Sequence, residues 1–275
     1  MEEVKNLLRN LANKSKGSGV LKRNILKEYL QILVLDFIYS NPKYSELFFY
    51  GGSCLMHCFG LPRLSEDIDF VDAKGNIEIA ILARDLKNYF KKNTDLNPIA
   101  AVQKFRIYLK FPLLHEMKLS KESESDLLFL KIEIFSDFNF CRNYKSEIVP
   151  LFKFNKSILA KTFDFPTLMS TKIRAILYRK WEKTDKKGKS IIKVKGRDYF
   201  DLMWYLDKGI KPNINCIENI KNEDELKEKL LKIIEKVDPK SIKLDLESMI
   251  EDQNFIKNLS KNIKNILTRQ IIDKL

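Results

Sequence analysis

The chain has 275 residues, of which 44% are hydrophobic and 32% charged, and its formal net charge at pH 7 is +13. This length accommodates two modest domains or one large one, and the composition is that of a globular protein. No run of eighteen apolar residues occurs, which excludes a membrane-spanning helix, and the opening Met-Glu-Glu lacks a signal-peptide pattern, which predicts a cytoplasmic protein.

The cysteines do not form a regular pattern. They stand at positions 54, 58, 141 and 216, and this spacing matches neither a disulfide framework nor a zinc site. We therefore expect all of them to be buried core thiols.

The first part of the chain is predicted to form three helices and a strand. Apolar residues at helical spacing predict helices over 2–12 and 20–39. Residues 47–50 predict a short strand that leads into Gly51-Gly52, and a further helix is expected to open at Ser53.

A glycine turn and a pair of carboxylates follow each other closely. Backbone N–H groups at the start of a helix attract phosphate, so Gly51, Gly52 and Ser53 predict a phosphate cradle. Residues 66–71 alternate polar and apolar, which predicts a strand with Asp67 and Asp69 on one face. Two neighbouring carboxylates repel unless a cation lies between them, and oxygen ligands favour Mg²⁺.

These residues also resemble a known signature. Gly51-Gly52-Ser53, Arg63, Ser65 and Asp67-Ile68-Asp69 are similar to the first motif of the polymerase-β-like nucleotidyltransferases. The resemblance is closer to the AbiEii branch, the toxin half of type IV toxin–antitoxin pairs. It implies that Arg63 and Ser65 help to bind a nucleoside triphosphate. The alternative interpretation is an acidic surface strand after a glycine loop, with Arg63 a plain surface residue.

The next segments predict a helix over 75–93 and strands over 104–111, 128–135 and 148–152. In the resembled superfamily a third carboxylate on a neighbouring strand completes the metal site. Glu133 is the best-placed candidate here. Two alternatives stay open: Glu133 pairs only with Lys131, or Asp137 serves instead.

From Pro166 onwards the pattern is helical. A helix with Lys172 and Arg174, then a Lys-rich loop at 183–195, then Arg197-Asp198-Tyr199-Phe200-Asp201 resembles the later motifs of the AbiEii family. The resemblance implies that Lys172 and Asp198 are active-site residues. The plain alternative is that Asp198 caps a helix or that Arg197 pairs with Asp201.

Most of the positive charge is concentrated in one stretch. Residues 151–200 hold 14 Lys or Arg against 4 Asp or Glu, so these fifty residues carry ten of the thirteen excess charges. An evenly Lys-rich composition would not concentrate charge in this way, and the stretch therefore predicts a polyanion partner such as RNA. The candidate RNA-binding residues are Arg174, Arg179, Lys180, Lys186, Lys187, Lys189, Lys193 and Lys195.

Together these patterns predict an α/β (α+β) protein. Residues 1–165 are expected to form a nucleotidyltransferase domain with a mixed, antiparallel-biased sheet and catalytic motifs at 51–69 and 131–135. Residues 166–275 are expected to form a C-terminal helical bundle domain that contributes Lys172 and Asp198 to a cleft. Amphipathic patterns over 223–237, 241–251 and 253–273 support the bundle.

The expected reaction moves a nucleoside monophosphate from a nucleoside triphosphate to an acceptor hydroxyl. Two Mg²⁺ ions, with Mn²⁺ as an alternative, would be held by Asp67, Asp69 and Glu133. The resemblance implies a tRNA 3′ end as acceptor and a cognate antitoxin as a separate chain. The alternatives are a nucleotidyltransferase that modifies a small molecule or a protein, and a non-catalytic protein that binds nucleotide or RNA.

Overall fold

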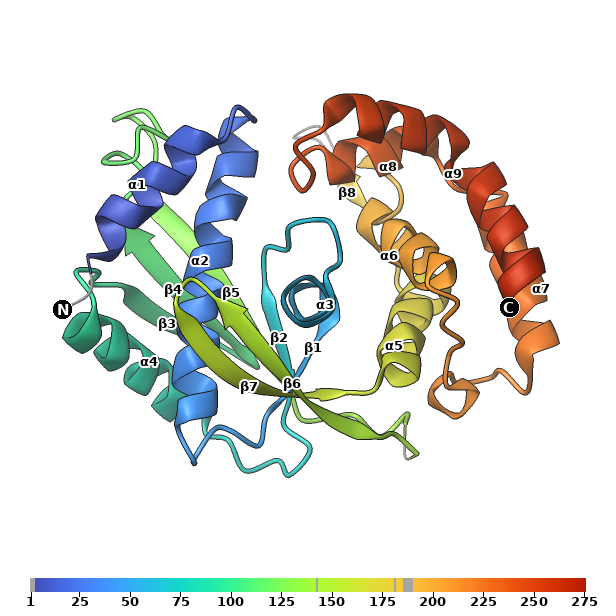
Figure 1. The fold of residues 1–275 in the computed structure, drawn as a ribbon, viewed down its shortest axis with the longest axis horizontal. Coiled ribbons are helices and arrows are strands. Elements are labelled where there is room, and N and C mark those ends of the chain that lie inside the picture. Colours follow the sequence, from blue (N-terminus) through green and yellow to red (C-terminus); the bar gives the residue numbers. More distant parts are fainter. Residues whose placement is uncertain (1–2, 142, 181, 185–189) are drawn as a thin grey trace. The chain divides into compact units, whose positions relative to one another are not determined.

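The computed structural model describes residues 3–141, 143–180, 182–184 and 190–275, and the chain divides into two units (Figure 1). The first unit comprises the residues up to Phe138 together with Glu147–Thr162. The second comprises Asn139–Ser146 and Phe163–Leu275. Segment 139–146 thus groups with the second unit, although the sequence predicted that residues 1–165 form the first domain. Each unit is described by itself below.

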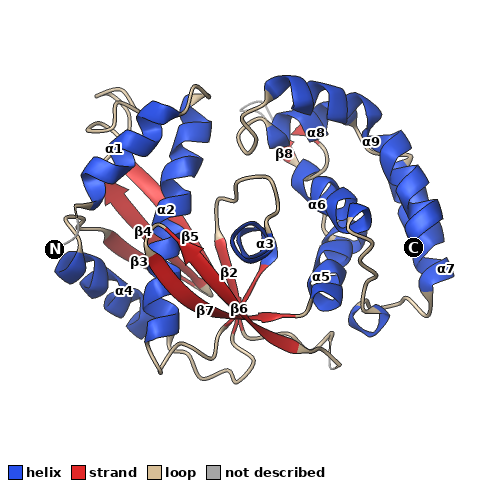
Figure 2. Ribbon diagram, in the orientation of Figure 1, coloured by secondary structure: helices blue, strands red, loops and turns tan. Residues whose placement is uncertain are grey.

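The first unit is built on a mixed sheet, coloured red in Figure 2. Within the described residues its strands are β1 (Phe48–Tyr50), β2 (Ile68–Val71), β3 (Ile99–Gln103), β4 (Arg106–Pro112), β5 (Leu127–Phe135), β6 (Ser146–Lys153) and β7 (Lys156–Phe163), in the order β3-β4-β5-β2-β1-β7-β6. The pairs β1–β2, β3–β4 and β4–β5 are antiparallel, whereas β2–β5 and β1–β7 are parallel. The predicted mixed sheet with an antiparallel bias is confirmed.

Helices flank this sheet. They are α1 (Val4–Lys14), α2 (Gly19–Ser40), α3 (Gly51–Phe59) and α4 (Ile79–Asn93). Helix α2 packs against β5 and against α1, α4 packs against β3 and β4, and α3 packs against β1 and β2. Helix α2 is buried on several sides, since all residues from Tyr29 to Leu35 are buried. Its fully buried side chains, such as Leu30 and Leu33, contribute about 1.5–3 kcal/mol each.

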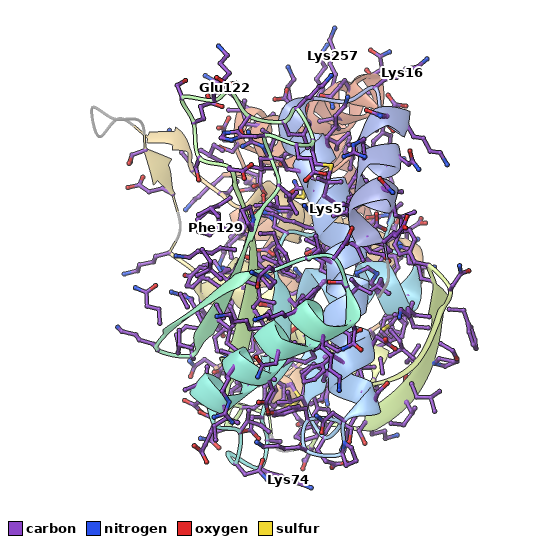
Figure 3. The ribbon with its side chains drawn as sticks, turned by 90° about the vertical axis from the view of Figure 1, so that its left-hand side faces the viewer. Lys5, Lys16, Lys74, Glu122, Phe129 and Lys257 are labelled. Atoms are coloured by element: carbon purple, nitrogen blue, oxygen red, sulfur yellow. A yellow bond between two sulfur atoms is a disulfide. The ribbon has the colours of Figure 1, made fainter. Side chains whose placement is uncertain are left out.

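Strand β5 shows the period of two that the sequence predicted. Leu128, Leu130 and Ile132 are buried on one face of β5, whereas Phe129 is exposed on the other (Figure 3). This alternation places Lys131 and Glu133 together on the face opposite the core.

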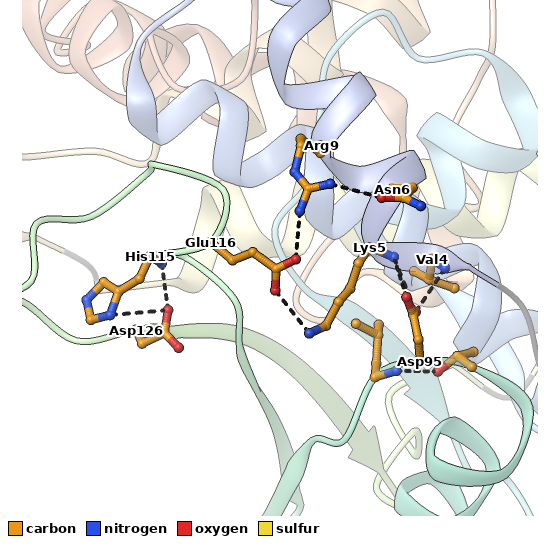
Figure 4. Close-up of polar contacts among 10 residues, drawn as sticks. Val4, Lys5, Asn6, Arg9, Asp95, His115, Glu116 and Asp126 are labelled. Carbon is orange, nitrogen blue, oxygen red and sulfur yellow. Dashed lines mark hydrogen bonds and ion pairs between the residues drawn. The ribbon is translucent and has the colours of Figure 1, made fainter.

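Helix α1 is held by residues from a distant part of the chain (Figure 4). The side chain of its N-cap residue makes no capping bond; instead Asp95 Oδ1 accepts a hydrogen bond from the Val4 backbone N–H at 2.9 Å. Glu116 forms ion pairs with Lys5 at 3.0 Å and with Arg9 at 2.7 Å. A carboxylate at the N-terminus stabilises a helix through the unpaired N–H groups and the helix dipole.

The second unit is mainly helical. Its elements are α5 (Phe165–Tyr178), β8 (Lys183–Thr184), β9 (Ser190–Ile192), α6 (Gly196–Asp207), the 3₁₀-helix η1 (Ile214–Cys216), α7 (Glu223–Ile234), α8 (Pro239–Leu246) and α9 (Gln253–Lys274). Helix α6 contacts α5, α8 and α9, and α7 packs on α9. The side chains of Asp164, Asn222, Asp238 and Asp252 cap α5, α7, α8 and α9. The predicted C-terminal helical region is confirmed.

The prediction that every cysteine is a core thiol was wrong for one pair. Cys141 and Cys216 form a disulfide within the second unit, across a sequence separation of 75 residues. Nothing in the local sequence signals this pair, because the fold alone brings the two positions together. Cys54 is a buried thiol as expected, whereas Cys58 is half-buried. No helix in the described part of the chain is long and apolar enough to cross a membrane.

Candidate functional site

The glycine turn of the first unit fits tightly against a carboxylate. Strand β1 ends at Tyr50 and α3 begins at Gly51, whose φ is +78°, a value that favours glycine. Tyr50 is in register with Asp69 of β2, and a Cβ atom on Gly51 would overlap the Asp69 carboxylate. Gly51 therefore allows Asp69 to lie against the start of α3, where unpaired N–H groups favour negative charge.

The sheet brings the predicted carboxylates to neighbouring positions. In the parallel pairing of β2 with β5, Asp69 lies in register with Glu133. Asp67 directly precedes β2 and is bound by Lys131 of β5, with 2.9 Å between Lys131 Nζ and Asp67 Oδ2. The alternative candidate, Asp137, is exposed and lies beyond the end of β5.

Glu133 is bound by two cations in this arrangement. Lys131 Nζ lies 3.3 Å from Glu133 Oε1, and Arg106 Nε on β4 lies 2.5 Å from the same oxygen. Burial alone would raise the pKa of Glu133, but the hydrogen bond from Arg106 and the charge of Lys131 outweigh it and lower that pKa. Lys131 thus bridges Asp67 and Glu133 and neutralises part of the repulsion for which the sequence predicted a metal ion.

Within the residues that the structure describes, no three His, Cys, Asp or Glu side chains converge as a ready metal site. The donor chemistry nevertheless fits a hard divalent cation, since Asp67, Asp69 and Glu133 offer only oxygen. Ligation by Asp67 and Glu133 together requires Lys131 to leave the position between them.

The predicted phosphate-binding residues gather around Gly52. A Cβ atom on Gly52 would lie 2.9 Å from Arg63 Nη2 and 3.0 Å from Ser65 Oγ, and both side chains are buried. Ser53 is fully buried, and its hydroxyl has no hydrogen-bond partner among the described residues. Most buried hydroxyls have a hydrogen-bond partner, so the Ser53 hydroxyl can donate a hydrogen bond to a ligand oxygen or to the loop after a rearrangement.

Two residues that the sequence analysis did not select hold the loop that carries Ser65. Gln31 Nε2 on α2 donates to the Ser65 carbonyl at 2.8 Å, and Gln31 Oε1 lies 2.9 Å from His57 Nε2 on α3. Burial lowers the pKa of His57 to about 3, so the ring is neutral at physiological pH. A fully buried glutamine within the apolar stripe of α2 is the signal that could have identified this support.

The second unit contains its own charged cluster. Lys172 Nζ on α5 lies 2.7 Å from Asp201 Oδ2 and 3.3 Å from Asp198 Oδ1, both on α6. Arg179 Nη1 lies 2.9 Å from Asp198 Oδ2. Burial alone would raise the pKa of Asp198, but Lys172, Arg179 and Lys195 together lower it. The predicted neighbours Lys172 and Asp198 are therefore in direct contact.

The candidate RNA-binding residues differ in their surroundings. Arg174 binds both carboxylate oxygens of Glu218 at 2.5 Å and lies over the ring of Phe140, so it has a structural role. Lys180 and Lys193 are exposed, and Lys195 is half-buried. Lys186, Lys187 and Lys189 lie outside the described residues.

Comparison with known proteins shows a match along most of the chain. The sequence profile of the family described as nucleotidyl transferase AbiEii toxin, type IV TA system, matches residues 35–273. Two solved structures are similar: a proposed nucleotidyltransferase from H. pylori (16% identity, 90% of this chain and 95% of that one, TM-score 0.46) and JHP933 from Helicobacter pylori (14% identity, 90% and 93%, TM-score 0.47). No curated protein matches the sequence.

Proposed function

The chain belongs to the AbiEii nucleotidyltransferase toxin family of type IV toxin–antitoxin systems, and on this basis we propose that it transfers a nucleoside monophosphate from a nucleoside triphosphate to an acceptor hydroxyl, with release of pyrophosphate. The observation that carries the proposal is the placement of Asp69 beside Glu133 and against the start of α3. Carboxylates at the start of a helix suit a reaction in which phosphate oxygens and metal ions must meet.

Asp67, Asp69 and Glu133 are the proposed ligands of two Mg²⁺ ions, with Mn²⁺ as a substitute. Such ions, when bound, supply positive charge to the triphosphate and to the reacting oxygens. Without the ions, Lys131 bridges Asp67 and Glu133, and Arg106 also binds Glu133 and lowers its pKa. Metal binding should therefore compete with the ion pairs of Lys131.

Other residues of the first unit would hold the substrate. The backbone N–H of Gly52 and the hydroxyls of Ser53 and Ser65 would donate hydrogen bonds to phosphate oxygens, and Arg63 would neutralise their charge. Glu133 would accept the proton of the acceptor hydroxyl, because its register with Asp69 places it at the proposed metal site, beside the reacting oxygens.

From the second unit, we propose that Lys172 neutralises the triphosphate and that Asp198 orients the Lys172 ammonium. The 3.3 Å contact between them and the second contact to Asp201 limit the positions that this ammonium can take. A preorganised cation contributes more to transfer than a mobile one, since less ordering remains when charge develops.

We further propose RNA as the acceptor, with the tRNA 3′ end as the specific target and a cognate antitoxin as the partner implied by the family. The concentration of positive charge in residues 151–200 supports a polyanion. Affinity for single-stranded RNA should fall with salt by a log–log slope of about 0.7 for each neutralised phosphate. Changing Lys186, Lys187 and Lys189 together to Gln should flatten this slope and leave nucleotide binding unchanged.

The decisive experiment incubates the protein with each labelled nucleoside triphosphate, Mg²⁺ and either total tRNA or small-molecule and protein acceptors. Labelled tRNA is the expected result, and label on another acceptor would favour the alternative substrates. Asp69→Asn should abolish transfer. Glu133→Gln and Asp137→Asn form a matched pair, of which only the first should lose activity.

Metal binding gives a second, independent measurement. Titration with Mn²⁺, followed by electron paramagnetic resonance, should show weaker binding in Asp67→Asn than in the wild type. Lys131→Met should bind Mn²⁺ more tightly, because the internal competitor is gone. Unchanged Mn²⁺ binding in both variants would show that Asp67 and Lys131 do not belong to the metal site.

A further inference from the structure

A small cavity in the second unit is lined mainly by positive side chains. Its volume is about 40 Å³, which exceeds the space needed for a single water molecule and suits one tetrahedral oxyanion. The charges come from Arg179 directly after α5, from Lys193 and Lys195 in the segment before α6, and from Asp198 on α6. The remaining lining includes the apolar side chains of Ile176 and Val194.

The charges around this cavity are not balanced by the protein. Three cations face one carboxylate, and that carboxylate is already bound by Lys172 as well as by Arg179. Lys195 is half-buried, and although Asp198 attracts its ammonium, the positive charges of Arg197, Arg179 and Lys172 repel it. A partly buried ammonium among several cations is unfavourable, and an anion in the cavity would relieve this cost.

We propose that this cavity binds a phosphoryl group, held by the half-buried Lys195 and, at the exposed edge, by Arg179 and Lys193. A phosphate dianion would offset the net excess of two positive charges among the charged residues that line the cavity. Its oxygens would accept hydrogen bonds from the Lys195 ammonium and from the Arg179 guanidinium. The inference rests on the proposed function for the source of the phosphoryl group, which is either the nucleoside triphosphate or the RNA.

Sulfate is a suitable probe, because it is a tetrahedral dianion that does not titrate near neutral pH. Calorimetric titration of the full chain with sulfate at pH 7 should give at least tenfold weaker binding for Lys195→Gln than for the wild type. Lys257→Gln removes the same charge from an exposed position on α9 and should bind like the wild type (Figure 3). Equal affinity of wild type and Lys195→Gln would overturn the proposal.

The pH dependence of sulfate binding is a second test. Burial lowers the pKa of Lys195, and so do the positive charges of Arg197, Arg179 and Lys172; Asp198 opposes them, and the net pKa is about 8. Wild-type affinity should therefore fall about tenfold between pH 7 and pH 9 as Lys195 loses its proton. Lys195→Gln should lack this change, and the same pH profile in both proteins would contradict the site.

Lys193→Gln keeps the proposal testable if Lys195→Gln fails to fold, because Lys193 is exposed and its loss should still weaken sulfate binding severalfold. Competition then identifies the source: displacement of sulfate by triphosphate alone assigns the nucleotide, and displacement by RNA alone assigns the acceptor. Failure of both triphosphate and RNA to displace sulfate would overturn the phosphoryl assignment. Sulfate binding that depends on Lys195 without any nucleotidyl transfer would refute the proposed function and leave the cavity site standing.

Discussion

Replacing Lys195 by Met should stabilise the second unit at neutral pH. The pKa of Lys195 is lowered from 10.5 to about 8, which corresponds to about 3 kcal/mol of unfavourable free energy in the folded, charged form. Solvent screening of a half-buried group reduces this figure, and we expect a gain of roughly 1–2 kcal/mol. Methionine keeps the length of the side chain and its contacts with the cavity wall while it removes the charge.

The size of this gain should depend on pH in a defined direction. Below pH 8 the folded and unfolded chains both carry the Lys195 proton, so the full cost is present. Between pH 8 and pH 10.5 the unfolded chain binds more protons at this position than the folded chain, so the cost fades as the pH rises. The advantage of Lys195→Met should therefore shrink from pH 7 to pH 10.

Urea unfolding followed by tryptophan fluorescence is the appropriate assay. Trp204 lies on α6 in the second unit, so its fluorescence reports on the unfolding of that unit. Lys257→Met, at an exposed position, should change stability by less than about 0.5 kcal/mol at either pH. The reasoning would be refuted if Lys195→Met were less stable than the wild type at pH 7. It would also be refuted if the gain in the free energy of unfolding were the same at pH 7 and pH 10.

Three further substitutions test the geometry. Gly51→Ala should lower the melting temperature in calorimetry more than Gly60→Ala does. Both glycines have a positive φ, which costs about 1–2 kcal/mol in alanine, but only at Gly51 would the added Cβ atom overlap Asp69. Asp201→Asn should cost about 3 kcal/mol in urea unfolding, because Lys172 loses a fully buried partner; unchanged stability would show that the pair contributes nothing. Cys216→Ser should lower the free energy of unfolding by up to about 4 kcal/mol, given the loop of 75 residues that the disulfide closes, and an equal loss on reducing the wild type would confirm the cause.

The sequence by itself determined the helices and strands whose residue pattern lies within one short segment. The apolar stripe of α4 and the alternation along β5 follow from periods of 3.6 and 2, which depend only on neighbouring residues. The glycine turn and the Asp67–Asp69 pair were recognisable for the same reason, because their spacing lies within one short stretch and matches a family motif.

Only the tertiary structure decided which distant residues meet. The pairing of Glu133 with Arg106 depends on the register of β4 with β5, and the disulfide between Cys141 and Cys216 depends on the fold of the second unit. Likewise, Lys195 differs from the exposed Lys193 only through burial and the charges around it. Register, burial and local electrostatics are properties of packed chains, and no pattern within a single segment of sequence encodes them.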